Sequence, residues 1–296
     1  MAGLRAVRHS SLLQIHGAVF LFGLSGLFGK LVSLPPTVIV LGRVAFATLF
    51  LSAVLTYRRQ GVRLRSWRDV ASLAALGVIL AVHWVTFFQS VQVSTVAIGL
   101  LTFSTFPVFV TFLEPVFFSE GIARSDVLLA LIAVFGVGLV VPDFDISSQL
   151  TQGALWGVAS GFLFAVLSIL NRRFVQSYSS LSIALYQDGT AVIVLIPFLF
   201  VTKPVFSPQD IALLAFLGIV CTGIAHTMFI SGLSNVKART ASIIATLEPV
   251  YGVALSAVLL GEIPTARVVL GGVIILGAAY YATLRSGPAA RGAESN

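Results

Sequence analysis

A series of long apolar stretches constrains the fold of this chain more than any other feature of its sequence. Ten stretches that carry almost no charge follow one another, with short polar loops between them. A helix needs about 20 mainly apolar residues to cross the roughly 30 Å of hydrocarbon in a bilayer. The sequence therefore predicts an all-α integral membrane protein with ten transmembrane helices, at residues 12–32, 36–57, 69–90, 93–118, 125–141, 151–172, 180–201, 208–230, 236–260 and 266–284.

The composition excludes a water-soluble fold. Charged residues make up 10% of the chain, against about 25% in a typical soluble protein, and the mean hydropathy is +1.01. Such a chain cannot cover its surface with polar groups, so lipid must solvate it. Cys221 is the one cysteine, so the chain cannot form an internal disulfide and offers no cysteine framework for a metal. We predict no metal site and no cofactor.

The Lys and Arg residues orient the predicted helices. Fourteen of them lie at one set of helix ends and three at the other, if both termini are placed on the same side. Because cytoplasmic loops collect positive charge, this distribution predicts cytoplasmic N- and C-termini, with segments 1–11 and 285–296 outside the bilayer. The net charge of +7 is thus explained by orientation in a bacterial inner membrane, and no nucleic-acid partner is expected. The N-terminal region has no A-x-A-type cleavage site, so its apolar stretch is interpreted as a retained span.

The two halves of the chain align at a shift of 142 residues. FSTFPVFVTFLEPVFFSE (103–120) lies over ATLEPVYGVALSAVLLGE (245–262), which places Pro107 on Pro249. A gap of about three residues near the second and seventh spans pairs Arg43 with Asp188. We interpret residues 12–141 and 151–284 as two five-helix repeats. Because five is odd, the second repeat must be inverted, and inverted repeats are typical of secondary transporters.

These motifs resemble the drug/metabolite transporter superfamily, in its EamA-like branch. Members have two five-helix repeats, with a proline in the fourth and ninth spans and a glutamate at their ends, as in PVFVTFLEPVFFSE and PVYGVALSAVLLGE. The LGR at 41–43 is similar to an arginine found in the second span. In overall likeness the chain is most similar to bacterial aromatic amino acid exporters. The resemblance implies export of bulky amino acids through a cavity between the repeats.

The stretch TLEPVYG (246–252) places Glu248 directly before Pro249 in an apolar run. An ionisable side chain at mid-bilayer costs roughly 2.5–3.5 kcal/mol on insertion scales, so it usually faces the interior. Glu248 is predicted to contact a substrate ammonium group or to carry a proton, and the alternative is a structural pairing with Arg43. Pro107 and Pro249 are predicted hinges, with a static kink as the alternative.

Other polar and aromatic residues are candidates for a substrate cavity. Arg43 could receive a carboxylate through its planar guanidinium, or could hold helices together with Asp188. In AVHWVTFFQSVQ (81–92), helical spacing would bring an imidazole and aromatic rings onto adjoining faces. The substrate-binding prediction comprises Arg43, His83, Trp84, Phe87, Trp156, Ser160, Tyr186, Glu248 and Tyr251. For the aromatic members near span ends, the alternative is an interfacial anchor.

Three functions remain open from the sequence. The first is a secondary exporter of amino acids, aromatic ones favoured, that works by alternating access. The second is a proton-coupled drug or metabolite exporter in which Glu248 carries the proton. The third, remote, is an intramembrane serine hydrolase, because GLSG (23–26) has the form G-x-S-G and His226 could act as its base. No nucleotide-binding motif is present, so the expected partners are a small-molecule substrate and the bilayer, with the protein a monomer or weak dimer.

Overall fold

The computed structural model describes residues 2–62, 64–118, 124–141 and 145–285. Arg63, Glu120 and nearly all of the predicted tail lie outside these residues.

The first half contains α1 (Ala2–Gly26), α2 (Phe28–Leu31), α3 (Pro36–Tyr57), α4 (Trp67–Val93), α5 (Val96–Phe103), α6 (Phe106–Phe118) and α7 (Arg124–Val140). The second half contains α8 (Gln149–Phe174), α9 (Ser180–Leu195), α10 (Pro197–Thr202), α11 (Pro208–Gly218), the π-helical turn η1 (Ile219–Ile224), α12 (Ala225–Gly232), α13 (Ala238–Ala245), α14 (Glu248–Leu259) and α15 (Ala266–Arg285).

These elements form helices long enough to cross a bilayer. Eight apolar stretches of 20–27 residues qualify among the described residues: Ser10–Leu31, Pro36–Tyr57, Trp67–Val93, Val96–Phe117, Gln149–Phe174, Ser180–Thr202, Pro208–Gly232 and Thr240–Leu259. Two shorter apolar helices, Val127–Val140 and Ala266–Tyr281, occupy the places of the fifth and tenth predicted spans. The all-α membrane fold is confirmed, and the ten helical segments coincide with the ten predicted spans to within a few residues.

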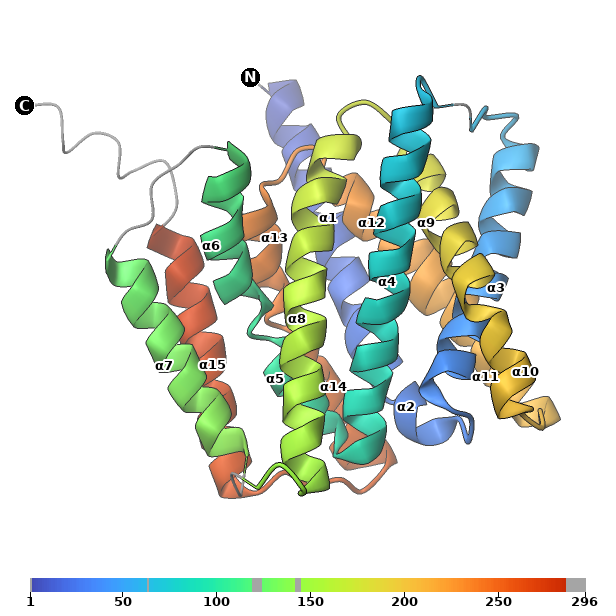
Figure 1. Ribbon diagram of the computed structural model, residues 1–296. Coiled ribbons are helices and arrows are strands. Elements are labelled where there is room, and N and C mark those ends of the chain that lie inside the picture. The colour runs from blue at the N-terminus through green and yellow to red at the C-terminus, as the bar shows by residue number, and fades with distance from the viewer. Residues whose placement is uncertain (1, 63, 119–123, 142–144, 286–296) are drawn as a thin grey trace, which may run out of the picture.

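The first long helices of the two halves, α1 and α8, run in opposite directions. Figure 1 shows α1 beginning at the upper edge beside the N-terminus, whereas α8 begins at the lower edge and ends at the upper one. Helices of the two halves also pack on each other, as α4 does on both α8 and α9, and α1 on α12 and α14. The centre of the bundle is therefore built from both halves.

The fourth and ninth predicted spans are each broken into two helices at the same place. α5 ends at Phe103 and α6 begins at Phe106, and 142 residues later α13 ends at Ala245 and α14 begins at Glu248. Pro107 and Pro249 are each the second residue of the new helix, where a missing backbone N–H leaves no helical hydrogen bond unmade. The prolines thus begin helices after a break, instead of bending a continuous helix.

Small residues let the helices of the centre approach closely. A Cβ added to Gly161 of α8 would lie 2.7 Å from the backbone oxygen of Phe103 in α5. A Cβ on Gly23 of α1 would lie 2.8 Å from the backbone oxygen of Glu248 in α14. The GVASG stretch at 157–161 therefore lies against a neighbouring helix, as expected of a small-residue packing face, and the first glycine of GLSG has a packing role of its own.

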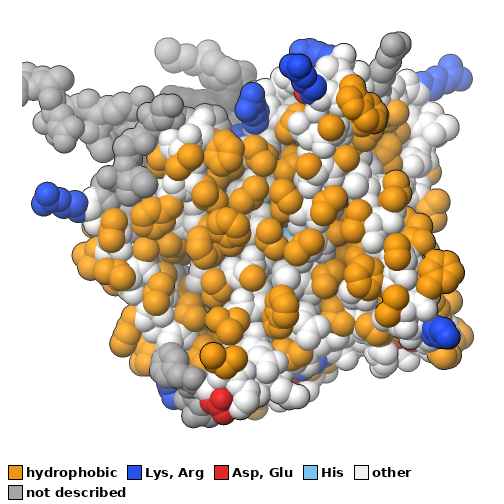
Figure 2. All heavy atoms as spheres, in the orientation of Figure 1, with side chains coloured by type: hydrophobic (Ala, Val, Ile, Leu, Met, Phe, Trp, Pro, Cys, Tyr) orange, Lys and Arg blue, Asp and Glu red, His pale blue; other side chains and the backbone are white. Residues whose placement is uncertain are grey.

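The surface has the distribution expected of a membrane protein. Figure 2 shows hydrophobic side chains covering the middle of the visible face, with most of the visible Lys and Arg side chains near its upper edge. Large apolar side chains such as Leu49, Phe200 and Val258 are more than 60% exposed. In lipid this exposure is favourable.

Candidate functional site

A small closed cavity lies at the centre of the bundle, between the two halves. Its walls come from α1, α3, α4, α5, α8, α12 and α14, through Phe22, Ser25, Arg43, Leu80, His83, Trp84, Phe87, Phe103, Phe164, His226 and Glu248. All eleven lining residues are buried, so none connects the cavity openly to either end of the bundle. The free volume is ≈ 20 Å³, enough for about one water molecule.

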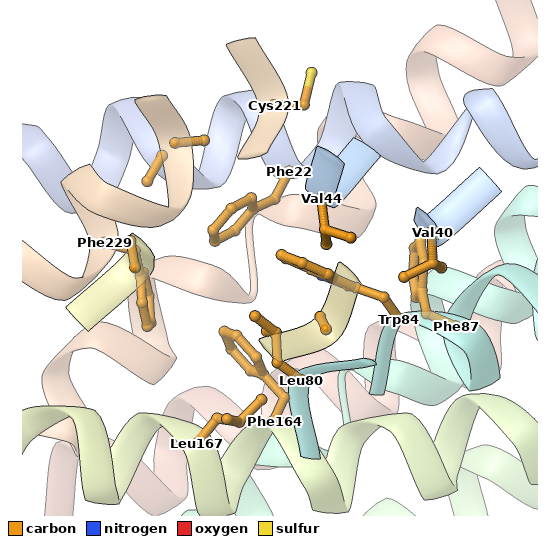
Figure 3. Packing of buried hydrophobic residues seen from close by; sticks show 14 of the residues in the cluster. Phe22, Val40, Val44, Leu80, Trp84, Phe87, Phe164, Leu167, Cys221 and Phe229 are labelled. Atoms are coloured by element: carbon orange, nitrogen blue, oxygen red, sulfur yellow. The ribbon is translucent and has the colours of Figure 1, made fainter. Parts of the chain in front are cut away.

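Aromatic rings form most of the wall. Figure 3 shows the side chains of Phe22, Trp84 and Phe164 pointing toward one another across the centre. His83 stacks on Phe164, with ring centroids 5.2 Å apart, and Phe22 meets the same phenylalanine edge to face at 6.5 Å. Such a wall suits an aromatic or bulky apolar guest, because offset and edge-to-face ring contacts are favourable.

Arg43 is the main positive charge at the cavity. It is 1% exposed, and its guanidinium carbon lies 3.9 Å from the centroid of the Trp84 ring. Its Nε donates a hydrogen bond of 2.9 Å to Thr222 Oγ1, while Nη1 has no hydrogen-bond partner among the described residues. Thr222 in turn donates to the carbonyl of Leu217, five residues back, within the π-helical turn. The guanidinium is therefore fixed on one side and has an unused donor.

Glu248 places a carboxyl group on the same cavity. It is the first residue of α14, and the close approach of Gly23 to its backbone fixes α14 against α1. Its Oε2 is buried and has no hydrogen-bond partner among the described residues. Glu248 and Arg43 interact electrostatically, but no ion pair within 4 Å joins them in the described part of the chain. The alternative of a direct pairing with Arg43 is thus not what the structure shows, and Oε2 lies at the cavity without a partner among the described residues.

His83 is held by α8. Its Nδ1 lies 2.9 Å from Ser160 Oγ and 3.0 Å from the Ser160 carbonyl oxygen, and Ser160 Oγ also donates to the His83 carbonyl. Both residues are buried, although only His83 lines the cavity. Ser160 therefore acts on the cavity through the imidazole that it orients.

Asp188 and His226 form a second polar group beside the cavity. Asp188 of α9 is fully buried, and neither of its carboxyl oxygens has a hydrogen-bond partner among the described residues. His226 Nδ1 lies 3.9 Å from Asp188 Oδ1 and is likewise unpartnered. The His226 ring meets the edge of Trp84 at 5.6 Å. His226 and Trp84 occupy corresponding positions at the 142-residue shift, so the repeat brings equivalent residues together at the centre.

Polar contacts close the end of the bundle opposite the N-terminus. Lys30 Nζ donates 2.7 Å to the carbonyl of Ser94, which joins α2 to the end of α4. Glu262, beyond α14, accepts 2.9 Å from the backbone N–H of Val96 at the start of α5. A carboxylate at a helix N-terminus is favourable, so Glu262 stabilises the closed arrangement.

We expect the variant Glu262→Gln to open this end more often. Loss of a carboxylate at a helix N-terminus costs about 0.3–1 kcal/mol, which corresponds to roughly a two- to fivefold change in an equilibrium. The measurement is the rate at which a maleimide labels Ser25→Cys in a Cys221→Ala background. The variant Asp145→Asn, which changes an exposed loop carboxylate at the same end, should leave the rate unchanged. Equal labelling in the Glu262 and Asp145 variants would contradict the prediction.

The structure brings some of the predicted site residues together and leaves others apart. Arg43, His83, Trp84, Phe87 and Glu248 all line the cavity, and Ser160 stands directly behind it. The remaining members do not line it. Trp156 is 43% exposed on the outer surface, Tyr186 is half-buried in α9, and half-buried Tyr251 makes a ring contact with Phe20 at 5.4 Å.

The sequence prediction omitted several residues that lie at the site. Phe22, Leu80, Phe103 and Phe164 belong to apolar runs in which nothing distinguishes one phenylalanine or leucine from the next. Ser25 is predicted from the sequence only as a possible nucleophile, although it lines the cavity. His226 is an interior candidate by its depth in the eighth span and by its alignment with Trp84 across the repeat, but it is not in the substrate-binding prediction.

Comparison with known proteins gives the family. The model of the EamA-like transporter family matches residues 9–141 and, separately, residues 151–284. The chain belongs to this family. An EamA-like protein is a membrane transporter, and residues of both matched segments line the central cavity.

Two relatives of this EamA-like chain cover most of its length. YxxF of Bacillus subtilis (strain 168), described as an uncharacterized transporter, is 29% identical over 280 residues, 92% of this chain and 89% of that protein. The pseudopaline exporter CntI of Pseudomonas aeruginosa is 27% identical over 247 residues, 82% of this chain and 84% of that protein. Neither is described as an aromatic amino acid exporter, so that part of the expectation stays a proposal.

One solved crystal structure shares the fold. It superposes with a TM-score of 0.71 and covers 95% of this chain and 99% of its own, at 19% sequence identity. The arrangement of helices is therefore that of a fold already seen in a solved structure.

Proposed function

We propose that this EamA-like transporter exports small zwitterionic metabolites, aromatic and other bulky amino acids first among them, across the bacterial inner membrane. The central cavity carries the proposal: aromatic rings surround one guanidinium and one carboxyl group, each with an unpartnered atom. An amino acid offers the matching groups, because its carboxylate fits the Arg43 fork, its ammonium group fits Glu248, and its side chain stacks on the rings. The relative named for pseudopaline export supports the export of a small metabolite.

Transport would proceed by alternating access between two inverted repeats, with both termini cytoplasmic. The opposite directions of α1 and α8, and the equal breaks at 104–105 and 246–247, support this mechanism. The cavity holds only about one water, so the closed form must open to admit a guest. The breaks before Pro107 and Pro249 are the proposed hinges, since turn hydrogen bonds, such as Thr105 N–H to the Thr102 carbonyl and Leu247 N–H to the Ile244 carbonyl, replace the continuous α-helical pattern there.

The test is efflux from proteoliposomes. Vesicles that contain the purified protein and are loaded with labelled phenylalanine should release it faster than protein-free vesicles. Unlabelled aromatic amino acids should compete with it. Release equal to that of empty vesicles, across a broad panel of amino acids, would reject amino acid export.

The variant Glu248→Gln tests the role of the carboxylate. Loss of a hydrogen bond to a charged group costs about 1.5–3 kcal/mol, so we expect the apparent affinity for phenylalanine to fall by roughly ten- to a hundredfold. The control is Asp145→Asn, which changes a carboxylate in an exposed loop and should leave the affinity unchanged. Glu114→Gln is unsuitable as a control because Glu114 forms a 3.0 Å ion pair with Arg172. Unchanged affinity in Glu248→Gln would remove Glu248 from the proposed binding site.

A second candidate function is proton-coupled export of a drug or metabolite, with Glu248 as the proton carrier. The unpartnered Oε2 of Glu248 favours it, because a buried carboxyl group that lacks a partner is better protonated than charged. A pH gradient should then drive flux in the parent protein and fail to drive it in Glu248→Gln. Serine hydrolysis remains the remote alternative, and labelling of Ser25 by a serine-reactive probe would be its sign.

A further inference from the structure

We propose that Asp188, together with His226, is a proton-binding site of this protein, separate from the carboxyl group of Glu248 that faces the guest. The closed state would hold one proton on Asp188. Protonation forms an O–H bond on the carboxylate as an O–H bond of a hydronium ion from the solvent breaks, which leaves one water molecule.

The first support is the environment of Asp188. Its side chain is fully buried, and both carboxyl oxygens lack a hydrogen-bond partner among the described residues. A buried carboxylate that is neither paired nor hydrogen-bonded is strongly unfavourable, and such groups become neutral instead. Glu248 lines the cavity, where about one water molecule can solvate it, but Asp188 does not line the cavity. The drier of the two carboxyl groups is therefore the better place for the proton.

The second support is the charge of the central cluster. The described charged and titratable groups that act on Asp188 are Arg43 on α3 and His226 on α12. Arg43 in turn interacts with Glu248 on α14 and Cys221 on η1, and His83 on α4 interacts with Arg43 and His226. Arg43 carries one positive charge, whereas Asp188 and Glu248 together would carry two negative charges. One proton makes the closed, water-poor cluster neutral. No described ion pair within 4 Å ties Arg43 to either carboxylate, so neutralisation by direct pairing is not what the structure shows.

The third support is a route by which the proton acts on the cavity. His226 Nδ1 lies 3.9 Å from Asp188 Oδ1 and is the nearest group able to take the proton when the helices move. His226 also contacts the edge of Trp84, whose face lies 3.9 Å from the Arg43 guanidinium carbon. Loss of the proton from Asp188 would leave a negative charge that attracts Arg43 and competes with a guest carboxylate. The presence or absence of a proton on Asp188 thus changes how strongly Arg43 can attract the carboxylate of the guest.

Infrared spectroscopy of the purified protein tests the site without any substrate. A protonated carboxylic acid gives a carbonyl stretching band that a carboxylate lacks. We expect the parent protein to show such a band near neutral pH and Asp188→Asn to lose it. The conservative variant Asp188→Glu should keep a protonated acid but move its band to another frequency. Absence of the band from the parent, or a band whose frequency is the same in Asp188→Glu as in the parent, would overturn the proposal.

Trp84 fluorescence gives a second readout. In a Trp67→Phe, Trp156→Phe background, Trp84 is the remaining tryptophan. Its emission should change with pH, and Asp188→Asn and His226→Gln should each abolish that change, whereas Glu248→Gln should keep it. A pH response that vanishes in Glu248→Gln and survives in Asp188→Asn would place the proton on Glu248 and refute the assignment.

A third experiment measures transport and therefore rests on the proposed function, whereas the infrared and fluorescence experiments do not. Flux of labelled phenylalanine should respond to a pH gradient in the parent and not in Asp188→Asn. If the infrared band and the Trp84 response are present but no amino acid moves, the proton site stands and the proposed substrate fails. If amino acids move and Asp188→Asn still responds to the gradient, the proton on Asp188 is not the coupling proton and that role is refuted.

Discussion

The variant Arg43→Met should lose export almost completely. Arg43 is fixed by Thr222, stacks on Trp84 and keeps one guanidinium nitrogen unpartnered at the cavity. Its removal takes away the proposed carboxylate receptor and leaves Asp188 and Glu248 without their positive neighbour. Loss of a hydrogen bond to a charged group costs about 1.5–3 kcal/mol, so we expect the rate of phenylalanine efflux at low substrate concentration to fall by up to about a hundredfold. Arg43→Lys should recover little, because an ammonium group cannot both bond Thr222 and receive a carboxylate bidentately.

The matched control is Arg173→Met, which removes an exposed arginine from the end of α8. It should retain parental efflux. Purified Arg43→Met must elute as a folded, monodisperse protein for its efflux to be interpreted. Should the folded variant transport phenylalanine at the parental rate, Arg43 is not the carboxylate receptor.

The variant Gly77→Ala should destabilise the protein by about 1–3 kcal/mol, the usual cost of overpacking. A Cβ at this position of α4 would lie 2.6 Å from the backbone oxygen of Gln187 in α9 and 2.6 Å from the Cβ of Thr190. Neither atom is the tip of a flexible side chain, so α4 and α9 must separate. These helices carry Trp84 and Asp188, and we therefore expect the melting temperature and the transport activity to fall together.

Gly277→Ala provides the comparison for this glycine. Gly277 also lies in a helix, but no atom lies within 4 Å of its added Cβ. Alanine is the better helix former by roughly 0.5–1 kcal/mol, so this variant should be as stable as the parent or slightly more stable. The melting temperatures of the two purified variants in the same detergent decide the matter. Equal melting temperatures would mean that α4 and α9 do not pack as closely as described.

The fold was largely predictable because the physics that decides it is simple. A bilayer demands long apolar helices with their hydrogen bonds satisfied internally, and the ten stretches of the sequence meet that demand. The repeat was predictable as well, since the shift of 142 residues reappears in the equal helix breaks before Pro107 and Pro249. The exact place of those breaks was not, because proline fixes only its own φ angle and suits the first turn of a helix as well as a kink.

The site was predictable in its polar members and not in its apolar ones. Arg43, His83 and Glu248 stand out because charge or imidazole inside a span is costly and so faces the interior. Trp156 and Phe164 lie eight residues apart on α8, yet the first faces outward and the second lines the cavity. Sequence hydrophobicity does not separate lipid-facing from cavity-facing aromatic rings, since both environments are apolar. That assignment depends on the rotation of each helix, which only the packed structure determines.

The π-helical turn Ile219–Ile224 ties the chemistry of the centre to the length of one helix. A π-helical turn holds one residue more than an α-helical turn, so a chain one residue shorter here could wind as an ordinary α-helix and leave α11 and α12 in place. Side chains within the turn would be redistributed around the axis in steps of about 100°, which changes the side chain that faces Arg43 in place of Thr222. The extra residue of this turn therefore serves the orientation of the Arg43 guanidinium, and its deletion should cost transport activity while the helices flanking the turn remain packed.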